Sequence, residues 1–212
     1  MIRANTAHAV VLGFCFAYAS RVQAQPDSHA MHSKGFDHQQ VASVTFADLE
    51  TTAAQLQTAR RATEKYQDVE QAEADGYRAI GPDVPGMGIH YVLAAGSRAV
   101  GFDVERPDIL LYEKDRASPG GYALVGVSYL FNAEPDRDEQ PKNPPFPKSL
   151  ASWHRHADLC VLPDRSVKGQ LTAQQCEALG GQFTALTQWM VHAWIWKDSP
   201  TGVFSATNPT VQ

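Results

Sequence analysis

The stretch YALVGVSYLF, residues 122–131, indicates the fold class. It is nearly continuous in apolar residues, which is typical of a strand that is covered on both faces. Further short β-prone runs are separated from it by segments rich in Gly and Pro; they are Ile89–Leu93, Ile109–Tyr112 and Trp189–Trp196. The second half of the chain therefore predicts a β-rich, mainly antiparallel domain.

The region before these strands has a helical pattern. Thr45 is expected to cap a helix, and Asp48 follows three positions later, as in a capping box. Apolar residues then recur at intervals of three and four up to about Asp75, and Gly76 is a natural stop. These residues are Leu49, Ala53, Leu56, Ala59, Ala62, Tyr66 and Val69. The pattern predicts one long amphipathic helix, or two in series.

A second, short helix is expected in TAQQCEALGG, with Thr172 as its cap and Gly180-Gly181 as its end. A long helix followed by strands and one short helix predicts an α+β fold. The sequence contains no internal repeat and no second-domain linker, so residues 45–212 are expected to form a single domain.

The N-terminal segment has the pattern of a secretory signal peptide. Arg3 precedes an apolar run of about eleven residues, Ala9 to Ala19, which is too short to span a membrane. Cleavage is expected after Ala24, which would release the chain to the periplasm or the medium. Residues 25–44 (QPDSHAMHSKGFDHQQVASV) are polar and are expected to form a flexible arm.

Charge argues against nucleic acid as a partner. The full chain has 18 Lys and Arg against 23 Asp and Glu, and residues 1–24 contain two Arg and no acidic residue. The mature chain would therefore have 16 basic and 23 acidic residues, which gives a formal net charge of −7. A nucleic-acid-binding protein needs a basic face, so neither nucleic acid nor an anionic lipid surface is expected as a partner.

Cleavage would leave two cysteines, Cys160 and Cys176. An even pair in an exported protein is most simply a disulfide, and closing a loop of this size contributes about 3 kcal/mol in the chain-entropy description. The alternative is that a cysteine thiolate binds a metal, as at a blue-copper site.

Histidines carry the functional signal. His154 and His156, in SWHRHADLC, are two positions apart, so on a strand both imidazoles lie on one face and can converge on one ion. His192, in QWMVHAWIWK, alternates with Met and Trp and is expected to be buried. His90 follows a glycine-rich turn. The ordinary alternative is that these histidines are packed or half-exposed side chains without a ligand.

Soft and acidic side chains lie close to these histidines in the sequence. Met87 is near His90 and Met190 is near His192, and the arm contains His29, Met31 and His32. A thioether beside an imidazole favours copper over zinc, although filling gaps in the core is the ordinary role of Met87 and Met190. Asp158 follows His156 by two positions and is the preferred carboxylate to bind the ion or to orient a histidine. Other candidate carboxylates are Asp103, Glu105, Asp108 and Glu113.

Motifs of several enzyme classes are missing. The sequence contains no G-x-S-x-G, no phosphate-binding glycine loop, no G-x-G-x-x-G, no H-E-x-x-H and no C-x-x-C-H. These absences weaken the hydrolase, kinase and nicotinamide-enzyme hypotheses, and no nucleotide or haem cofactor is expected.

Six stretches together resemble a group of exported bacterial proteins of uncharacterised activity. They are GMGIHYV, RPDILLYE, LVGVSYLF, SWHRHADLC, C-EALGG-F and WMVHAWIWKDSPTGVFSATNP, and the likeness covers roughly residues 62–209. The group is marked by Met-Gly-x-His-Tyr and by His-x-Trp near the C-terminus. The resemblance implies that His90, the His154/His156 pair and His192 belong to one pattern. It also implies an acidic residue at the position where this chain has Ser128.

Three hypotheses follow. The first is a periplasmic protein that binds or delivers copper or zinc through one mononuclear site of His90, His154, His156 and His192, with the arm helping to capture the ion. The second is a metalloenzyme with three histidine ligands and an open position for a small organic substrate. In that case the pocket wall is expected to contain Tyr91, Tyr129, Trp153 and Trp194. The third is a metal-free structural or interaction module, which could bind a periplasmic partner protein.

Overall fold

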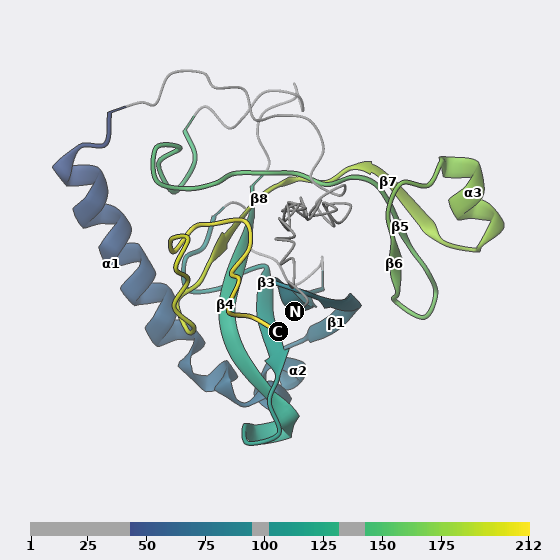
Figure 1. The fold of residues 1–212 in the computed structure, drawn as a ribbon, viewed down its shortest axis with the longest axis horizontal. Coiled ribbons are helices and arrows are strands. Elements are labelled where there is room, and N and C mark those ends of the chain that lie inside the picture. The colour runs from purple at the N-terminus through teal and green to yellow at the C-terminus, as the bar shows by residue number, and fades with distance from the viewer. Residues whose placement is uncertain (1–42, 95–101, 132–142) are drawn as a thin grey trace, which may run out of the picture.

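The computed structural model describes residues 43–94, 102–131 and 143–212. The expected signal peptide and nearly all of the expected arm, including His29, Met31 and His32, lie outside the described residues. In the described part, antiparallel strands combine with a few helices, which confirms the α+β class (Figure 1).

The centre of the fold is a five-stranded antiparallel sheet in the order β1-β2-β3-β4-β8. The run at residues 122–131 is β4, which pairs with β3 along one edge and with β8 along the other. Residues 124–129 are all buried, so side chains on both faces of this strand are covered, as its apolar composition predicts. The predicted strands match β2, β3, β4 and β8, while β1 was not predicted. The strands are β1 (Tyr77–Val84), β2 (Gly88–Leu93), β3 (Ile109–Lys114), β4 (Tyr122–Phe131) and β8 (Trp189–Ala193).

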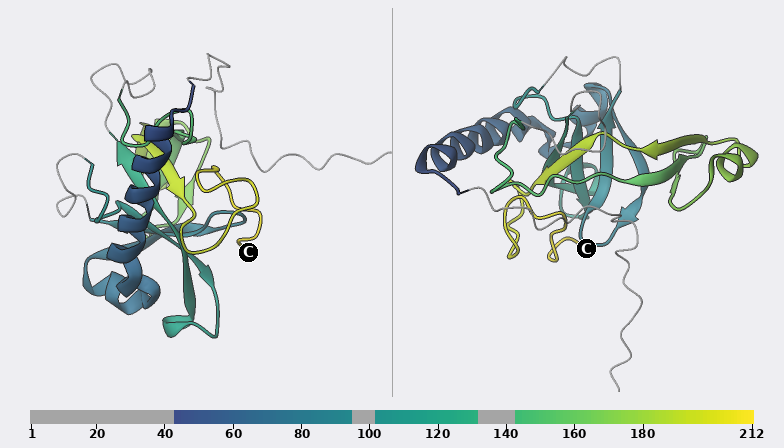
Figure 2. Two further views of the ribbon diagram at one scale, coloured as in Figure 1. Left: turned by 90° about the vertical axis from the view of Figure 1, so that its left-hand side faces the viewer. Right: turned by 90° about the horizontal axis from the view of Figure 1, so that it is seen from above.

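Helices cover one face of this sheet. The helical region consists of α1 (Phe46–Thr63), the 3₁₀ turn η2 (Glu64–Gln67) and α2 (Val69–Ala74). Figure 2 shows α1 running along the sheet. The main hydrophobic core lies in this layer and joins helix residues such as Ala59 and Val69 to strand residues such as Tyr112 and Val127.

The predicted cap of α1 is present. Thr45 Oγ1 accepts a hydrogen bond from the Asp48 backbone N–H at 3.1 Å, and the Asp48 carboxylate accepts one from the Thr45 N–H at 3.1 Å. This reciprocal pair satisfies two backbone donors that the first turn leaves open. The predicted stop also holds, because Gly76 has a positive φ of 98° directly after α2.

A second sheet of three strands, in the order β6-β5-β7, projects from the side opposite α1 (Figure 2). Its strands are β5 (Ala157–Val161), β6 (Val167–Lys168) and β7 (Gln182–Leu186), and the helix α3 (Ala173–Ala178) begins at the predicted Thr172 cap. The short 3₁₀ turn η4 (Pro119–Gly121) precedes β4 in the main sheet.

One long antiparallel ladder joins the two sheets. It begins at an isolated bridge between His154 and Met190 and continues as the pairing of β5 with β7, from Ala157–Leu186 to Val161–Gln182. The chain before β5 therefore runs beside β8, at the edge of the main sheet.

The disulfide prediction is confirmed. Cys160 and Cys176 form a bond with a Cα–Cα distance of 5.6 Å, and it ties β5 to α3. Both residues are fully buried. The alternative of a Cys160 thiolate as a metal ligand is therefore wrong, because the sulfur is already in a covalent bond.

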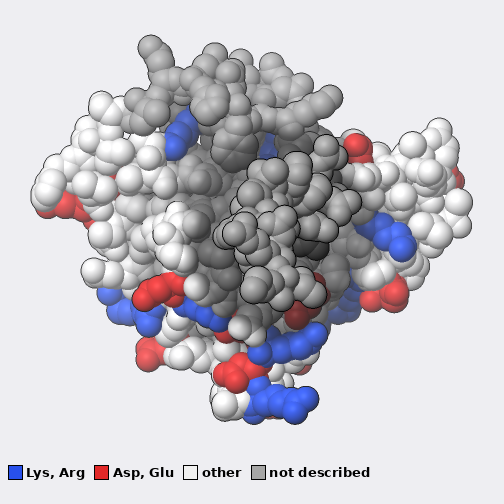
Figure 3. Space-filling view, in the orientation of Figure 1, with Lys and Arg blue, Asp and Glu red and all other residues white. Residues whose placement is uncertain are grey.

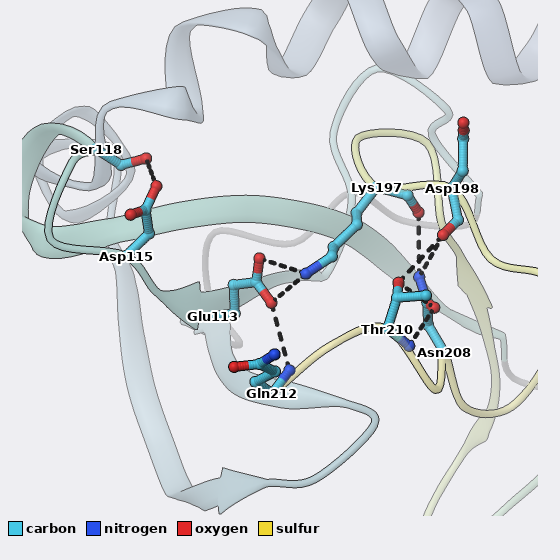
Figure 4. A network of polar contacts seen from close by, with 8 residues as sticks. All are labelled: Glu113, Asp115, Ser118, Lys197, Asp198, Asn208, Thr210 and Gln212. Carbon is cyan, nitrogen blue, oxygen red and sulfur yellow. Dashed lines mark hydrogen bonds and ion pairs between the residues drawn. The ribbon is translucent and has the colours of Figure 1, made fainter.

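The C-terminal segment is held by a polar network around Asn208, which is fully buried (Figure 4). Its side-chain amide donates hydrogen bonds to the carbonyls of Lys197 and Asp198, and its Oδ1 accepts from the Thr210 N–H and hydroxyl. Beside this network, Lys197 pairs with Glu113 of β3 at 2.7 Å. These contacts fix the segment that follows β8.

No helix in the described ranges combines the length and the apolar character that crossing a bilayer would need.

Removing the disulfide should destabilise the fold. The double variant Cys160→Ala/Cys176→Ala frees a loop whose closure contributes about 3 kcal/mol to stability. We expect a corresponding fall in the free energy of unfolding, measured by denaturant titration under non-reducing conditions. If reduction by dithiothreitol lowers the stability of the wild type but leaves the double variant unchanged, the effect belongs to this bond; equal sensitivity would contradict that assignment.

Asn208→Ala should also destabilise the fold, because it removes a fully buried amide that bonds the carbonyls of Lys197 and Asp198 and the N–H and hydroxyl of Thr210. We expect a loss on the order of 3 kcal/mol, read from thermal unfolding. Asp198→Ala is the matched control, since Asp198 is exposed and contributes its backbone carbonyl to the network. Similar losses in both variants would show that the Asn208 side chain does not hold this segment.

Candidate metal centre

Two of the predicted histidines project from the face of the main sheet opposite α1. His90 on β2 is opposite Leu111 of β3, and His192 on β8 is opposite Ser128 of β4. Two strands separate β2 from β8, so a flat sheet would place their backbones about 14 Å apart. The ring centroids of His90 and His192 are nevertheless only 5.8 Å apart. The sheet therefore curls toward this face and brings the two side chains together.

A glycine in β4 helps the sheet to curl, so that the rings of His90 and His192 come close together. Gly126 lies on β4 between the two histidine strands, and a Cβ there would be 2.9 Å from the Ala193 carbonyl and 3.0 Å from the Trp194 ring. The β3–β4 pairing also contains a register shift between Leu111 and Tyr112. Such a bulge increases the local twist of a sheet.

The ladder brings the other two histidines to the same place. The backbones of His154 and Met190 exchange hydrogen bonds of 2.9 and 2.8 Å, so His154 lies directly beside β8. The His156 N–H donates to Thr187 Oγ1, and its carbonyl accepts from the Thr187 N–H. The H-x-H pair thus lies in an extended segment just before β5.

The four imidazoles form one group, which we call the histidine cluster (His90, His154, His156 and His192). The ring centroids of His154 and His192 are 5.0 Å apart, and those of His154 and His156 are 5.4 Å apart. His156 also interacts electrostatically with both His90 and His192. All four predicted ligands are therefore neighbours, although they come from three separate parts of the chain.

Backbone carbonyls orient three of these rings. Nδ1 of His192 lies 2.8 Å from the Ala206 carbonyl, and Nδ1 of His154 lies 3.0 Å from the Ser152 carbonyl. His90 has a hydrogen bond to the backbone of Gly88. Because a carbonyl can only accept, the facing nitrogens of His192 and His154 carry the proton, which makes Nε2 the basic nitrogen of each neutral ring.

In His192, the hydrogen bond at Nδ1 leaves Nε2 as the nitrogen that could bind a ligand. The residue is fully buried, and its Nε2 has no hydrogen-bond partner among the described residues. A buried polar atom without a partner is costly and needs an explanation. A ring that donates from one nitrogen to a carbonyl and presents the other nitrogen is the usual state of a metal-binding histidine.

Burial keeps these rings neutral. Burial lowers the pKa of His90 to about 4, and the neighbouring His156 lowers it further. Burial lowers the pKa of His192 well below its ordinary value, and His154 and His90 act in the same direction. The neutral form is the one that binds a metal ion.

The ring spacing fits one tetrahedral ion. With Zn–N distances of about 2.0–2.1 Å and tetrahedral angles, two coordinated imidazoles have their centroids about 5 Å apart. The measured separations of 5.0, 5.4 and 5.8 Å are close to this value. Within the described ranges, however, no three His, Cys, Asp or Glu side chains already stand in coordinating geometry. Binding would therefore require the rings to turn within the cluster.

The two predicted methionines lie in different settings. Met190 pairs with His154 across the ladder, precedes His192 by two residues on β8, and is buried. Met87 is buried in the tight turn between β1 and β2.

Asp158 does not lie on the same strand face as His156, contrary to the prediction from the sequence. Asp158 is exposed, and its φ of 54° breaks the strand alternation that would have placed it on the same face as His156.

The predicted aromatic wall is mostly wrong. Tyr91, Tyr129 and Trp153 belong to the main core on the α1 side of the sheet, where Tyr129 donates to the Val104 carbonyl and Trp153 to the Phe146 carbonyl. Trp194 does contact the cluster, with its ring 5.6 Å from that of His192. The physical reason is alternation along the strand. Tyr91 and Tyr129 directly follow His90 and Ser128, so they must point to the other face.

The structure adds groups that the sequence did not single out as functional. The carbonyls of Ser152, Ala206 and Gly88 hold the rings, and no side-chain pattern marks a backbone acceptor. Ser128, which occupies the position where an acid was expected, is fully buried opposite His192. Its hydroxyl has no hydrogen-bond partner among the described residues, so it is a further polar group on the cluster side of the sheet.

Comparisons with known protein families, with curated proteins and with solved structures give no match. The chemistry of the cluster therefore depends on what its own side chains can do. Four imidazoles with a buried thioether beside them form a donor set for a transition metal ion.

The histidine cluster predicts stability that is lost in acid. Because the pKa values of His90 and His192 are lowered in the folded chain, the unfolded chain takes up protons first as the pH falls. Their contribution is complete above about pH 6.5 and declines toward pH 4, by on the order of 2 kcal/mol at pH 5 for His90 alone. Thermal unfolding of chelator-treated protein across this range should show the decline.

His90→Gln removes one of these titrating groups, so its unfolding temperature should depend less steeply on pH between about 7 and 4.5 than that of the wild type. His38→Gln, outside the described residues, is the control and should keep the wild-type slope. Parallel profiles for His90→Gln and the wild type would contradict a lowered pKa at His90.

Proposed function

We propose that this protein binds one transition metal ion in the histidine cluster, with His90, His154, His156 and His192 as the ligands, and that it carries or delivers that ion. The observation that supports this most directly is the state of His192. Its Nδ1 is tied to a carbonyl, while its buried Nε2 has no described partner beside three other imidazoles. A bound ion would satisfy that nitrogen.

Copper is the preferred ion. Imidazoles bind both zinc and copper, whereas a thioether selects copper, particularly Cu(I). Met190 is buried next to His154 and His192 and is the thioether best placed to act. We also propose that the arm, through His29, Met31 and His32, captures the ion before the cluster binds it.

We further propose that the chain works in the periplasm or outside the cell. The support is the signal-peptide pattern of residues 1–24 together with the buried Cys160–Cys176 disulfide. Such bonds persist in oxidising compartments and are rare in the cytosol.

A three-histidine catalytic site is the second candidate. Three of the four rings, those of His90, His154 and His192, have described hydrogen bonds to backbone carbonyls, as preorganised ligands do. If only these three bound the ion, a fourth position would be open for water or substrate.

The test is the metal content of the full-length chain, purified without an affinity tag and incubated with copper or zinc before dialysis. We expect about one copper per chain by elemental mass spectrometry. His154→Ala/His156→Ala should lose it, because two of the four ligands are gone. His38→Ala, with a histidine removed outside the cluster, is the matched control and should keep it. No retained metal in the wild type, or equal retention in the double variant, would overturn the proposal.

Two further measurements separate the roles. Deletion of residues 25–44 should slow copper uptake and leave the final stoichiometry unchanged if the arm captures the ion; an unchanged uptake rate would remove the arm from this account. Azide, which binds to open Cu(II) positions, should add a charge-transfer absorption band only at a three-histidine site. An unchanged spectrum would favour a closed carrier site.

A further inference from the structure

A groove lies between α1 and the C-terminal segment. Its volume is about 510 Å³, within the range of pockets that hold small organic ligands. Three segments form it: the first half of α1, the chain before the H-x-H pair, and the turn after β8. The lining residues are Leu49, Thr52, Ala53, Leu56, Leu150, Ser152, Thr201, Gly202, Val203, Phe204, Ser205 and Ala206.

No charged side chain is among the described residues that line this groove. The lining consists of aliphatic and aromatic groups, such as Leu56 and Phe204, with a few hydroxyls. Figure 3 shows many of the Lys, Arg, Asp and Glu side chains of this face gathered toward its lower edge. An ionic ligand would find no counter-charge here.

In the first half of α1, part of the apolar stripe is not covered by the described residues. Leu49 and Ala53 belong to the stripe that the sequence predicts to be buried, yet Leu49 is 47 % exposed and Ala53 is exposed as well. Further along the same helix, Ala59 is fully buried in the main core. The apolar stripe therefore lines the groove in the first half of α1 and packs into the main core further along the helix.

Thr52 supplies a second, independent observation. It lines the groove, is only 5 % exposed, and its hydroxyl has no hydrogen-bond partner among the described residues. A buried threonine in a helix usually donates to the carbonyl four residues earlier, as Thr63 does to Ala59 at 2.8 Å. The Thr52 hydroxyl is therefore a hydrogen-bonding group that no described residue satisfies, next to an apolar cavity.

We propose that this groove binds an uncharged, mainly apolar small organic molecule that exchanges one hydrogen bond with the Thr52 hydroxyl. Apolar contact with Leu49, Leu56 and Phe204 provides the attraction, and Thr52 sets the orientation. The proposal does not depend on the metal site, because none of the four cluster histidines lines the groove.

The probe for the test is N-phenyl-1-naphthylamine, an uncharged molecule with one N–H donor whose fluorescence rises in apolar surroundings. Titrations use the full-length chain with a chelator present, so the result is independent of any bound metal. We expect saturable binding to the wild type. The anionic analogue 1-anilinonaphthalene-8-sulfonate should bind at least about tenfold more weakly, because the groove offers its sulfonate no cation.

Two exposed alanines of α1 provide a matched pair of variants. Ala53→Trp places an indole in the groove and should weaken binding of the neutral probe at least about tenfold. Ala54→Trp adds the same side chain at the next position, which does not line the groove, and should change binding less than about twofold. Equal effects of the two variants, or no saturable binding to the wild type, would overturn the proposal.

Thr52→Val tests the hydrogen bond. Valine keeps the shape and removes the hydroxyl, so binding of the neutral probe should weaken about fivefold. The unfolding temperature should not fall, because an unsatisfied buried hydroxyl is replaced by a methyl group. Unchanged binding would remove Thr52 from the site. A lower unfolding temperature would show that the hydroxyl already serves the fold.

Discussion

The antiparallel pairing of residues 154–161 with residues 182–190 is the constraint on which the rest of the structure depends. At one end it pairs His154 with Met190 and so places the H-x-H segment against β8. At the other end it becomes the β5–β7 pair, and the disulfide from Cys160 holds α3 to that end. A slip of one residue would turn every side chain of one strand to the other face, so the register of this ladder decides which side chains meet at the cluster.

Burying several imidazoles in one place removes their polar nitrogens from water, which costs free energy. Hydrogen bonds to backbone carbonyls offset part of this cost. Each carbonyl that accepts from a ring satisfies one nitrogen and fixes the tautomer. The remaining nitrogens stay neutral because burial and neighbouring rings disfavour a positive charge. Such an arrangement has more in common with a ligand site than with ordinary core packing, where a polar atom would normally have its partner inside the protein.

Local patterns of the sequence predicted much of the fold. The apolar run of β4, the cap at Thr45 and the short helix after Thr172 all depend on neighbouring residues, and all are present. Strand β1 was missed because its sequence contains Gly81 and Pro82 within a turn-like stretch. The curl that brings His90 to His192 depends on pairing between distant strands, which no local pattern contains.

Local sequence patterns also predicted part of the candidate site. The two-residue spacing of His154 and His156 and the apolar setting of His192 correctly selected side chains that meet. The aromatic wall failed because Tyr91 and Tyr129 were chosen by chemistry alone, although strand alternation already assigns them to the face opposite their histidine or serine neighbours. The orienting carbonyls could not be found at all, since every residue has one and only the fold selects among them.

The two carbonyls that hold His154 and His192 belong to Ser152 and Ala206, and the same two residues line the groove beside α1. The groove and the cluster therefore share these two backbone positions. A movement of either residue that reshapes the groove would also shift the carbonyl that holds an imidazole ring. Binding energy gained on one side would then appear as a change of affinity on the other, and thermodynamic linkage requires that this transfer be equal in both directions.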